Sequence, residues 1–195
     1  MESKSDITQV KFYKYRSLNN FERFADIVVN HRLYCSSIAD LNDPMEGFFH
    51  ANIVDHGFVT LEISEDQTRV CSLSSNIEDI RLWAHYADDH RGVAIAFQPN
   101  EKLTKVSYSE KLYHIKEGDH KYQRLFTKLI AWEYEKEYRY ISEEKHFLEG
   151  KIQKIILGVK TPEATKDLVR IIAEKQNIPI FQSKLDTEKY KIKIT

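Results

Sequence analysis

The apolar run at residues 93–97 constrains the fold more than any other feature of the sequence. All five residues, VAIAF, are apolar, and an unbroken apolar run of this length is typical of a strand covered on both faces of its sheet. Before it, Ser75 and Glu78 have the spacing of a capping box, which predicts a helix over residues 77–89. Gly92 suits the C-terminal cap of that helix. A helix therefore leads directly into a central strand.

Strands and helices mix along the rest of the chain without strict alternation. Strands are expected over residues 11–15, 33–35, 58–63, 69–73, 132–141, 152–159, 179–184 and 189–194, with a hairpin over 104–115. Further helices are expected after Ser17, over residues 119–130 and from Glu163 onward. The sequence therefore predicts one α+β domain over residues 1–195, in which a mixed, mostly antiparallel sheet packs against three to four helices.

Charge and apolar content argue against several classes of protein. Lys and Arg total 29 and Asp and Glu total 30, a net charge of −1, so the net charge does not indicate a nucleic-acid partner, although a local basic groove stays open. The absence of a long apolar run predicts no membrane partner, and the polar start MESKSDITQV lacks the apolar core of a signal peptide. Cys35 and Cys71 are then expected to be reduced, buried thiols of a cytoplasmic protein. The sequence leaves the oligomeric state open.

The helix expected at residues 77–89 carries the first group of candidate site residues. An apolar stripe at helical spacing is expected to face the core: Ile77, Ile80, Trp83, Ala84 and Ala87. His85 lies on a neighbouring stripe near Asp88, and a carboxylate beside an imidazole fixes its tautomer for acid/base work. Tyr86 would line the same wall. The alternative is a solvated ladder of Arg81, His85 and Asp89, four residues apart.

The segment WEYEKEYRYI at residues 132–141 is the second group. As a strand it places four aromatic residues on one face and four charged residues on the other: Trp132, Tyr134, Tyr138 and Tyr140 against Glu133, Glu135, Glu137 and Arg139. Arg139 would hold Glu137 ionised, which suits a carboxylate that binds a sugar hydroxyl or stabilises positive charge. The alternative is a charged strand surface that faces solvent and discourages edge pairing.

Two further candidates lie earlier in the chain. Asp43 and Glu46 have the spacing of a helix start, where carboxylates complement exposed backbone donors, and they could instead project into a cleft. Arg16 ends the first predicted strand, where it is either a surface residue or a bidentate grip on a phosphate or carboxylate.

Several signatures of common enzyme classes are missing from the sequence. The six glycines are too scattered for a phosphate-binding loop, and there is no Cys-x-x-Cys pair and no Gly-x-Ser-x-Gly motif. His85 and His90 are five residues apart, which does not place two ligands on one helical face, so no metal ligands are assigned.

Five separated segments resemble those of domain-of-unknown-function family 2971, in the same order. They are YKYRSLN (13–19), LYCSSIADLNDPMEG (33–47), LWAHYADDHRGVAIAF (82–97), WEYEKEYR (132–139) and IILG (155–158). Leu41 and Met45 stand where the family tends to have Phe, and Leu82 where it often has Met, so the polar candidates are unchanged. The resemblance implies a small bacterial or phage protein connected with mobile elements or defence, and it assigns no reaction.

The order of candidate residues is also similar to that of ADP-ribosyltransferases, which implies a nucleotide-like small-molecule ligand and NAD as the substrate. In that interpretation Arg16 binds the NAD phosphate or ribose, Tyr34 or Tyr86 lies under the nicotinamide, and Glu137 binds the ribose 2′-hydroxyl. Two alternatives remain open. One is a non-catalytic binding module in which Arg16, His85, Asp43 and Glu137 form a rigid polar network. The other is a metal-dependent hydrolase or nuclease that uses Asp43, Glu46, His85 and Asp88.

Overall fold

The main sheet holds ten strands in the computed structural model, which describes residues 11–43, 45–53, 56–62, 67–116, 118–120 and 122–195. Eight of these strands follow one another in the order β15 (Lys191–Ile194), β14 (Ile180–Asp186), β13 (Phe147–Leu157), β7 (Val93–Pro99), β1 (Phe12–Arg16), β6 (Arg69–Ser74), β12 (Glu137–Ser142) and β8 (Thr104–Lys105). Two short strands lie off this path, with β2 (Arg32–Tyr34) paired to β13 and β3 (Ser36–Ser37) paired to β6.

The pairing in this sheet is antiparallel except between β13 and β14. Parallel neighbours need a crossover connection, and the helix α3 (Glu163–Lys175) supplies it. The predicted central strand is confirmed, because β7 pairs with β1 on one side and β13 on the other, and residues 93–97 are all buried. The α+β class with a mixed, mostly antiparallel sheet is likewise confirmed.

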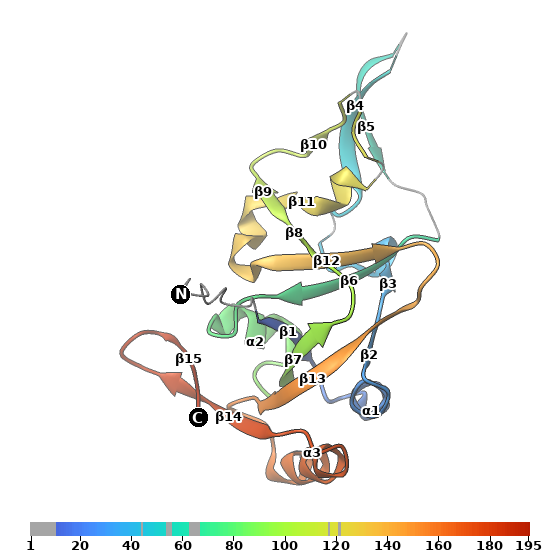
Figure 1. Ribbon diagram of the computed structural model, residues 1–195. Coiled ribbons are helices and arrows are strands. Elements are labelled where there is room, and N and C mark those ends of the chain that lie inside the picture. The colour runs from blue at the N-terminus through green and yellow to red at the C-terminus, as the bar shows by residue number, and fades with distance from the viewer. Residues whose placement is uncertain (1–10, 44, 54–55, 63–66, 117, 121) are drawn as a thin grey trace, which may run out of the picture.

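The described residues form three α-helices and three short 3₁₀-helices, and the α-helices lie on both faces of the sheet. The helices α1 (Phe21–Asn30) and α3 pack on one face, where Phe24, Val28 and Val169 join the larger hydrophobic core. The helix α2 (Ile80–Tyr86) packs on the other, with Trp83 against Tyr15. Figure 1 shows α1 and α3 together near the lower end of the main sheet, apart from α2. Among the described residues, no helix is long and apolar enough to cross a membrane.

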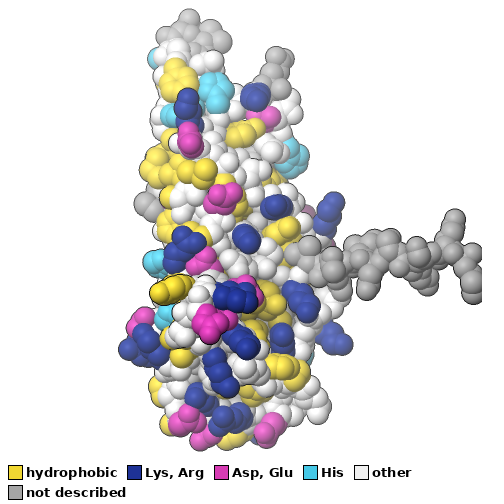
Figure 2. All heavy atoms as spheres, turned by 90° about the vertical axis from the view of Figure 1, so that its left-hand side faces the viewer, with side chains coloured by type: hydrophobic (Ala, Val, Ile, Leu, Met, Phe, Trp, Pro, Cys, Tyr) yellow, Lys and Arg dark blue, Asp and Glu magenta, His cyan; other side chains and the backbone are white. Residues whose placement is uncertain are grey.

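Smaller elements form the upper part of the molecule in Figure 1. A three-stranded sheet has the order β10 (Tyr113–His114), β4 (Phe48–Ile53) and β5 (Gly57–Glu62), and β9 (Ser107–Ser109) pairs in parallel with β11 (Thr127–Leu129). The 3₁₀-helices are η1 (Ile38–Asp40), η2 (Gln123–Phe126) and η3 (Ile130–Glu135). Figure 2 shows Lys and Arg side chains lying among Asp and Glu side chains on one face of the molecule.

Several predicted elements are wrong. The expected hairpin at residues 104–115 is three short strands that pair with other elements, and the expected helix at 119–130 is η2 followed by β11. The strand expected at 132–141 begins only at Glu137, because η3 precedes it and Lys136 turns the chain with φ 45°. The caps also differ: Asn20, not Ser17, caps α1, and Asp79, not Ser75, caps α2.

Gly92 has a different role from the predicted helix cap. The helix α2 ends at Tyr86, and Asp88, Asp89 and His90 all have positive φ before the chain enters β7. A Cβ atom on Gly92 would lie 2.1 Å from the backbone oxygen of Arg16. Glycine is therefore needed for the close approach of two backbones, and this approach fixes the end of β1 where Arg16 lies.

Candidate functional site

The main sheet opens between β1 and β6, and this opening contains the candidate site. These two strands share a single registered pair, Tyr13 with Ser74, whereas β6 is paired with β12 along six residues. Lys14 spans the gap, and its Nζ donates to the Ser72 backbone oxygen at 2.7 Å. A cavity of about 280 Å³ occupies the space beside this bridge.

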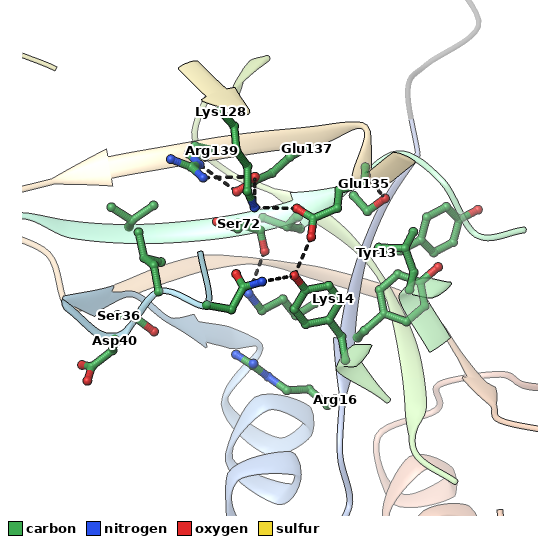
Figure 3. Close-up of a pocket in the computed structure, with 18 residues that line it drawn as sticks. Tyr13, Lys14, Arg16, Ser36, Asp40, Ser72, Lys128, Glu135, Glu137 and Arg139 are labelled. Atoms are coloured by element: carbon green, nitrogen blue, oxygen red, sulfur yellow. Dashed lines mark hydrogen bonds and ion pairs between the residues drawn. The ribbon is translucent and has the colours of Figure 1, made fainter. Parts of the chain in front are cut away.

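Charged and polar side chains line the cavity from both sides (Figure 3). The polar lining residues are Lys14, Arg16, Ser36, Asp40, Asn42, Ser72, Ser74, Tyr86, Lys128, Glu135, Glu137 and Arg139. Those on β12 and η3 face those on β1 across the opening. Buried charges are stable only when they are paired and hydrogen-bonded, so the partners of each group decide what the site can bind.

Arg139 is fully committed to the protein. Its side chain is 1% exposed, and it donates five hydrogen bonds. Both Nη atoms bind the Glu46 carboxylate, at 2.5 and 2.9 Å, Nε and Nη2 bind Glu137, at 2.7 and 3.1 Å, and Nη1 also binds the Leu125 backbone oxygen at 2.7 Å. A guanidinium has five N–H groups, so Arg139 positions two carboxylates and has no donor left for a ligand.

Glu137 is held ionised by two cations. Lys128 Nζ lies 3.3 Å from Glu137 Oε2 and 2.7 Å from Glu135 Oε2. Burial alone would raise the pKa of Glu137, but Arg139 and Lys128, together with hydrogen bonds from Arg139 and Ser72, outweigh it and lower the pKa to about 2. Glu137 is therefore a permanent anion inside the protein at neutral pH.

Glu135 has a different environment. Its Oε1 accepts a hydrogen bond from the Tyr86 hydroxyl at 2.5 Å, and that hydroxyl also accepts one from the Asn42 side-chain amide. Burial raises the pKa of Glu135, and the nearby Lys128 only partly offsets this effect. Burial, and then the Glu135 charge, raise the pKa of Tyr86 well above its ordinary value. Glu135 and Tyr86 therefore form a hydrogen-bonded acid/base pair on the cavity wall.

The β1 side of the cavity carries two cations that are not ion-paired. Lys14 has only the Ser72 backbone oxygen as a hydrogen-bond partner, and Arg16 forms no hydrogen bond or ion pair within the described chain. Burial, and then the Arg16 charge, lower the pKa of Lys14 to about 8. Burial also lowers the pKa of Arg16, which nevertheless stays protonated because a guanidinium pKa lies far above neutral pH.

The charges of this cluster can be balanced group by group. Three carboxylates, Glu46, Glu135 and Glu137, face two cations that touch them, Lys128 and Arg139. Lys14 faces the remaining negative charge across the cavity, and Glu137 is among the groups that raise its pKa. The third carboxylate of the lining, Asp40, is exposed and accepts a hydrogen bond from the Ser37 hydroxyl. Among the described residues Arg16 therefore contacts no anion, and the site has room for one more negative charge beside it.

The structure brings four of the nine predicted site residues to one cavity, joins a fifth to one of these four, and places the other four elsewhere. Arg16, Tyr86, Glu137 and Arg139 line the one cavity. Glu46 lies behind Arg139 and contacts the network from outside. The remaining four do not line the cavity: Tyr34, Asp43, His85 and Asp88.

These four residues have structural surroundings of their own. Tyr34 is 49% exposed on β2 and packs edge-on against Phe147. Asp43 is buried and accepts the Met45 backbone N–H at 2.9 Å, which makes it a turn residue. Asp88 lies in the left-handed turn after α2.

His85 is exposed because α2 presents a different face to the core than its sequence pattern indicated. The buried residues of that helix and its cap are Leu82, Trp83 and Ala87, whereas Ile80 is 42% exposed and Ala84 is exposed. This rotation directs Tyr86 toward the cavity and His85 away from it. The alternative ladder is also wrong, because Arg81 pairs with Asp79, and Asp89 pairs with Arg91 and Lys160.

Lys14, Lys128 and Glu135 belong to the site and were not predicted as site residues. Lys14 alternates with Tyr13 and Tyr15 as an exposed strand residue would, and only the opening of the sheet gives it a cavity to enter. Lys128 lay in a predicted helix that is absent. Glu135 carried a usable signal, since it shares the two-residue spacing of Glu137 and Arg139.

The described residues contain no group of three His, Cys, Asp or Glu side chains arranged to hold a metal ion. In particular, Asp43, Glu46, His85 and Asp88 do not converge, and Glu46 is already bound to Arg139. No family model, curated protein or solved structure matches this chain.

Proposed function

We propose that the cavity binds a small ligand of the nucleotide class through its phosphate, and that NAD is the ligand to test first. One observation carries the proposal: Arg16 lines the cavity as a cation with no anionic partner in the described chain. A guanidinium can form two parallel hydrogen bonds to a phosphate or a carboxylate. Such a ligand group would supply the negative charge that balances Arg16.

ADP-ribosyl transfer is the reaction we propose for this ligand. The cavity offers Arg16 for the phosphate, the Tyr86 ring as an aromatic surface, and two carboxylates for a ribose hydroxyl. Glu137 accepts from Arg139, Lys128 and Ser72, whereas Glu135 accepts from Tyr86 and Lys128 only. A carboxylate has about four acceptor positions, so Glu135 is better able than Glu137 to accept a ligand hydroxyl.

Membership of domain-of-unknown-function family 2971 is part of this proposal and depends on the five sequence segments described above. A connection with phage or mobile-element conflict and a cytoplasmic location are proposed on the same basis. The family, the biological context and the location do not depend on the geometry of the cavity, so the ligand experiments below test the site independently of these three proposals.

A non-catalytic binding module is the second candidate, and the bonding of Arg139 favours it. All of its N–H groups donate to acceptors within the protein, as expected of a residue that keeps a pocket rigid. The two candidates share the anion site at Arg16 and differ only in turnover.

Thermal unfolding with NAD, ADP-ribose and inorganic phosphate tests the shared anion site. We expect at least one of the three to raise the Tm of the wild type, and the rise to be lost in Arg16→Gln. If none of them raises the Tm, or if the rise persists in Arg16→Gln, the proposed site is wrong. Release of nicotinamide from NAD, measured by chromatography, separates the candidates: the transferase proposal predicts release that is lost in Glu135→Gln, and the binding module predicts none.

A further inference from the structure

The amine of Lys14 has surroundings that differ from those of a structural lysine. Its Nζ lies at the cavity, with a backbone oxygen as its only hydrogen-bond partner, and no carboxylate contacts it within the described chain. Arg16 lies two residues further along the same strand, and Figure 3 shows both side chains reaching from β1 toward the cavity. A desolvated lysine beside a second cation is the arrangement that activates an amine as a nucleophile.

We propose that Lys14 forms an imine with a small aldehyde or ketone that carries a phosphate or carboxylate, and that Arg16 binds this anionic group. The proposal rests on the anion site proposed above and names a class of substrate for it. The charge of Arg16 selects a substrate that carries an anionic group. Arg16 and Lys14 are two residues apart on β1, and this spacing sets how far the anionic group of the substrate lies from its carbonyl carbon. ADP-ribose, whose open-chain ribose carries an aldehyde, belongs to this class.

The reaction is a condensation without oxidation or reduction. The Nζ lone pair attacks the carbonyl carbon, and a carbon–nitrogen bond forms. Both amine protons then leave with the carbonyl oxygen as one water molecule, and the imine remains. The hydroxyl of Tyr86, hydrogen-bonded to Glu135, lines the same cavity and can exchange protons in these steps.

The groups that face Lys14 set the pH range of this reactivity. Burial and the Arg16 charge lower the pKa of Lys14 to about 8. Three groups raise it and only partly offset this effect: Cys71 on β6, Glu137 on β12, and Cys35, which directly precedes β3. At neutral pH the neutral fraction of such an amine exceeds that of an ordinary lysine on the order of a hundredfold. The rate of imine formation should therefore rise with pH and level off above about pH 8.

Labelling with pyridoxal 5′-phosphate, followed by borohydride reduction and peptide mapping, tests the proposal on the intact wild-type chain. Borohydride delivers hydride to the imine carbon and leaves a stable secondary amine. We expect Lys14 to be labelled at least tenfold faster than the exposed Lys151. Inorganic phosphate should compete with the reagent for Arg16 and slow the labelling of Lys14. Pyridoxal, which lacks the phosphate, is the matched reagent, and it should label Lys14 more slowly.

Two variants make the outcomes separable. Arg16 forms no hydrogen bond in the described chain, so Arg16→Gln is expected to fold. Because Arg16 also lowers the pKa of Lys14, the variant should slow labelling of Lys14 by both reagents, and it should remove the rate advantage of the phosphate reagent over pyridoxal. Lys14→Arg removes the amine and should remove the fast adduct. Labelling of Lys14 no faster than Lys151, with Arg16-dependent ligand binding intact, overturns this proposal and leaves the proposed function standing. Fast labelling that is equal for both reagents and unaffected by Arg16→Gln overturns the substrate class and the anion site together.

Discussion

Arg139 and Glu46 are 93 positions apart in sequence and form a bidentate ion pair behind the cavity, with Nη1–Oε1 at 2.5 Å and Nη2–Oε2 at 2.9 Å. Both side chains are nearly inaccessible to solvent, at 1% and 4% exposure. The pair joins β12 to the loop that precedes β4, so it connects the main sheet to the smaller one. It also orients the guanidinium that holds Glu137.

Glu46→Gln should strongly destabilise the fold. The substitution removes one of the two carboxylates that bind the Arg139 guanidinium and leaves only Glu137, and loss of one member of a buried ion pair costs about 3–5 kcal/mol. Urea denaturation gives the free energy of unfolding. Glu163→Gln is the matched control, because Glu163 pairs with Lys166 at the surface and its side chain is 75% exposed, where an ion pair contributes about 0–1 kcal/mol. Equal losses in the two variants would contradict the role of the buried pair.

Tyr86→Phe should weaken the η3 side of the cavity. It removes the hydroxyl that donates to Glu135 and accepts from Asn42, and a hydrogen bond to a charged group contributes about 1.5–3 kcal/mol. Tyr190→Phe is the control, since Tyr190 is 85% exposed. The free energy of unfolding of this control variant should equal that of the wild type. No loss of stability in Tyr86→Phe would show that the hydroxyl contributes nothing to the network.

Glu137 should contribute stability that disappears in acid. Its folded-state pKa is about 2, below its ordinary value of 4.5, so the contribution is fully present above about pH 4.5 and is lost as the pH falls toward 2. The difference in unfolding free energy between the wild type and Glu137→Gln should therefore shrink from pH 6 to pH 3. Glu135, whose pKa is raised by burial and also by Glu137, acts in the opposite direction and reduces the size of this change. A difference that stays constant or grows in acid would be inconsistent with an ionised Glu137.

Patterns within single elements predicted much of the fold. The apolar run of β7 identified the central strand, and Pro162 before Glu163 marked the start of α3. The two-residue spacing of Glu137 and Arg139 correctly placed both on one face of a strand. That face was predicted to meet either solvent or a site, and the structure buries it against the cavity, with Glu137 at 4% exposure.

The parts that were not predicted depend on how elements meet. No local pattern shows that β1 and β6 separate after a single registered pair, and this separation admits Lys14 and Arg16 to a cavity. The orientation of α2 is likewise set by packing of Leu82 and Trp83 on the sheet. This orientation determines that Tyr86, and not His85, lines the cavity. Residues 132–135 alternate as a strand would, but they belong to the 3₁₀-helix η3, which ends at the left-handed residue Lys136.

Titration calorimetry of NAD and ADP-ribose into the wild type, Arg16→Gln and Arg91→Gln is the most direct test of the anion site. Arg91 is a surface arginine paired with Asp89, with its side chain 50% exposed, so it controls for a general loss of positive charge. A charge-assisted bidentate contact predicts a Kd about 10–100-fold weaker in Arg16→Gln and unchanged in Arg91→Gln. Equal affinity of all three proteins for a ligand that binds, or no binding of either ligand to the wild type, would contradict the assignment of Arg16 as the phosphate-binding residue.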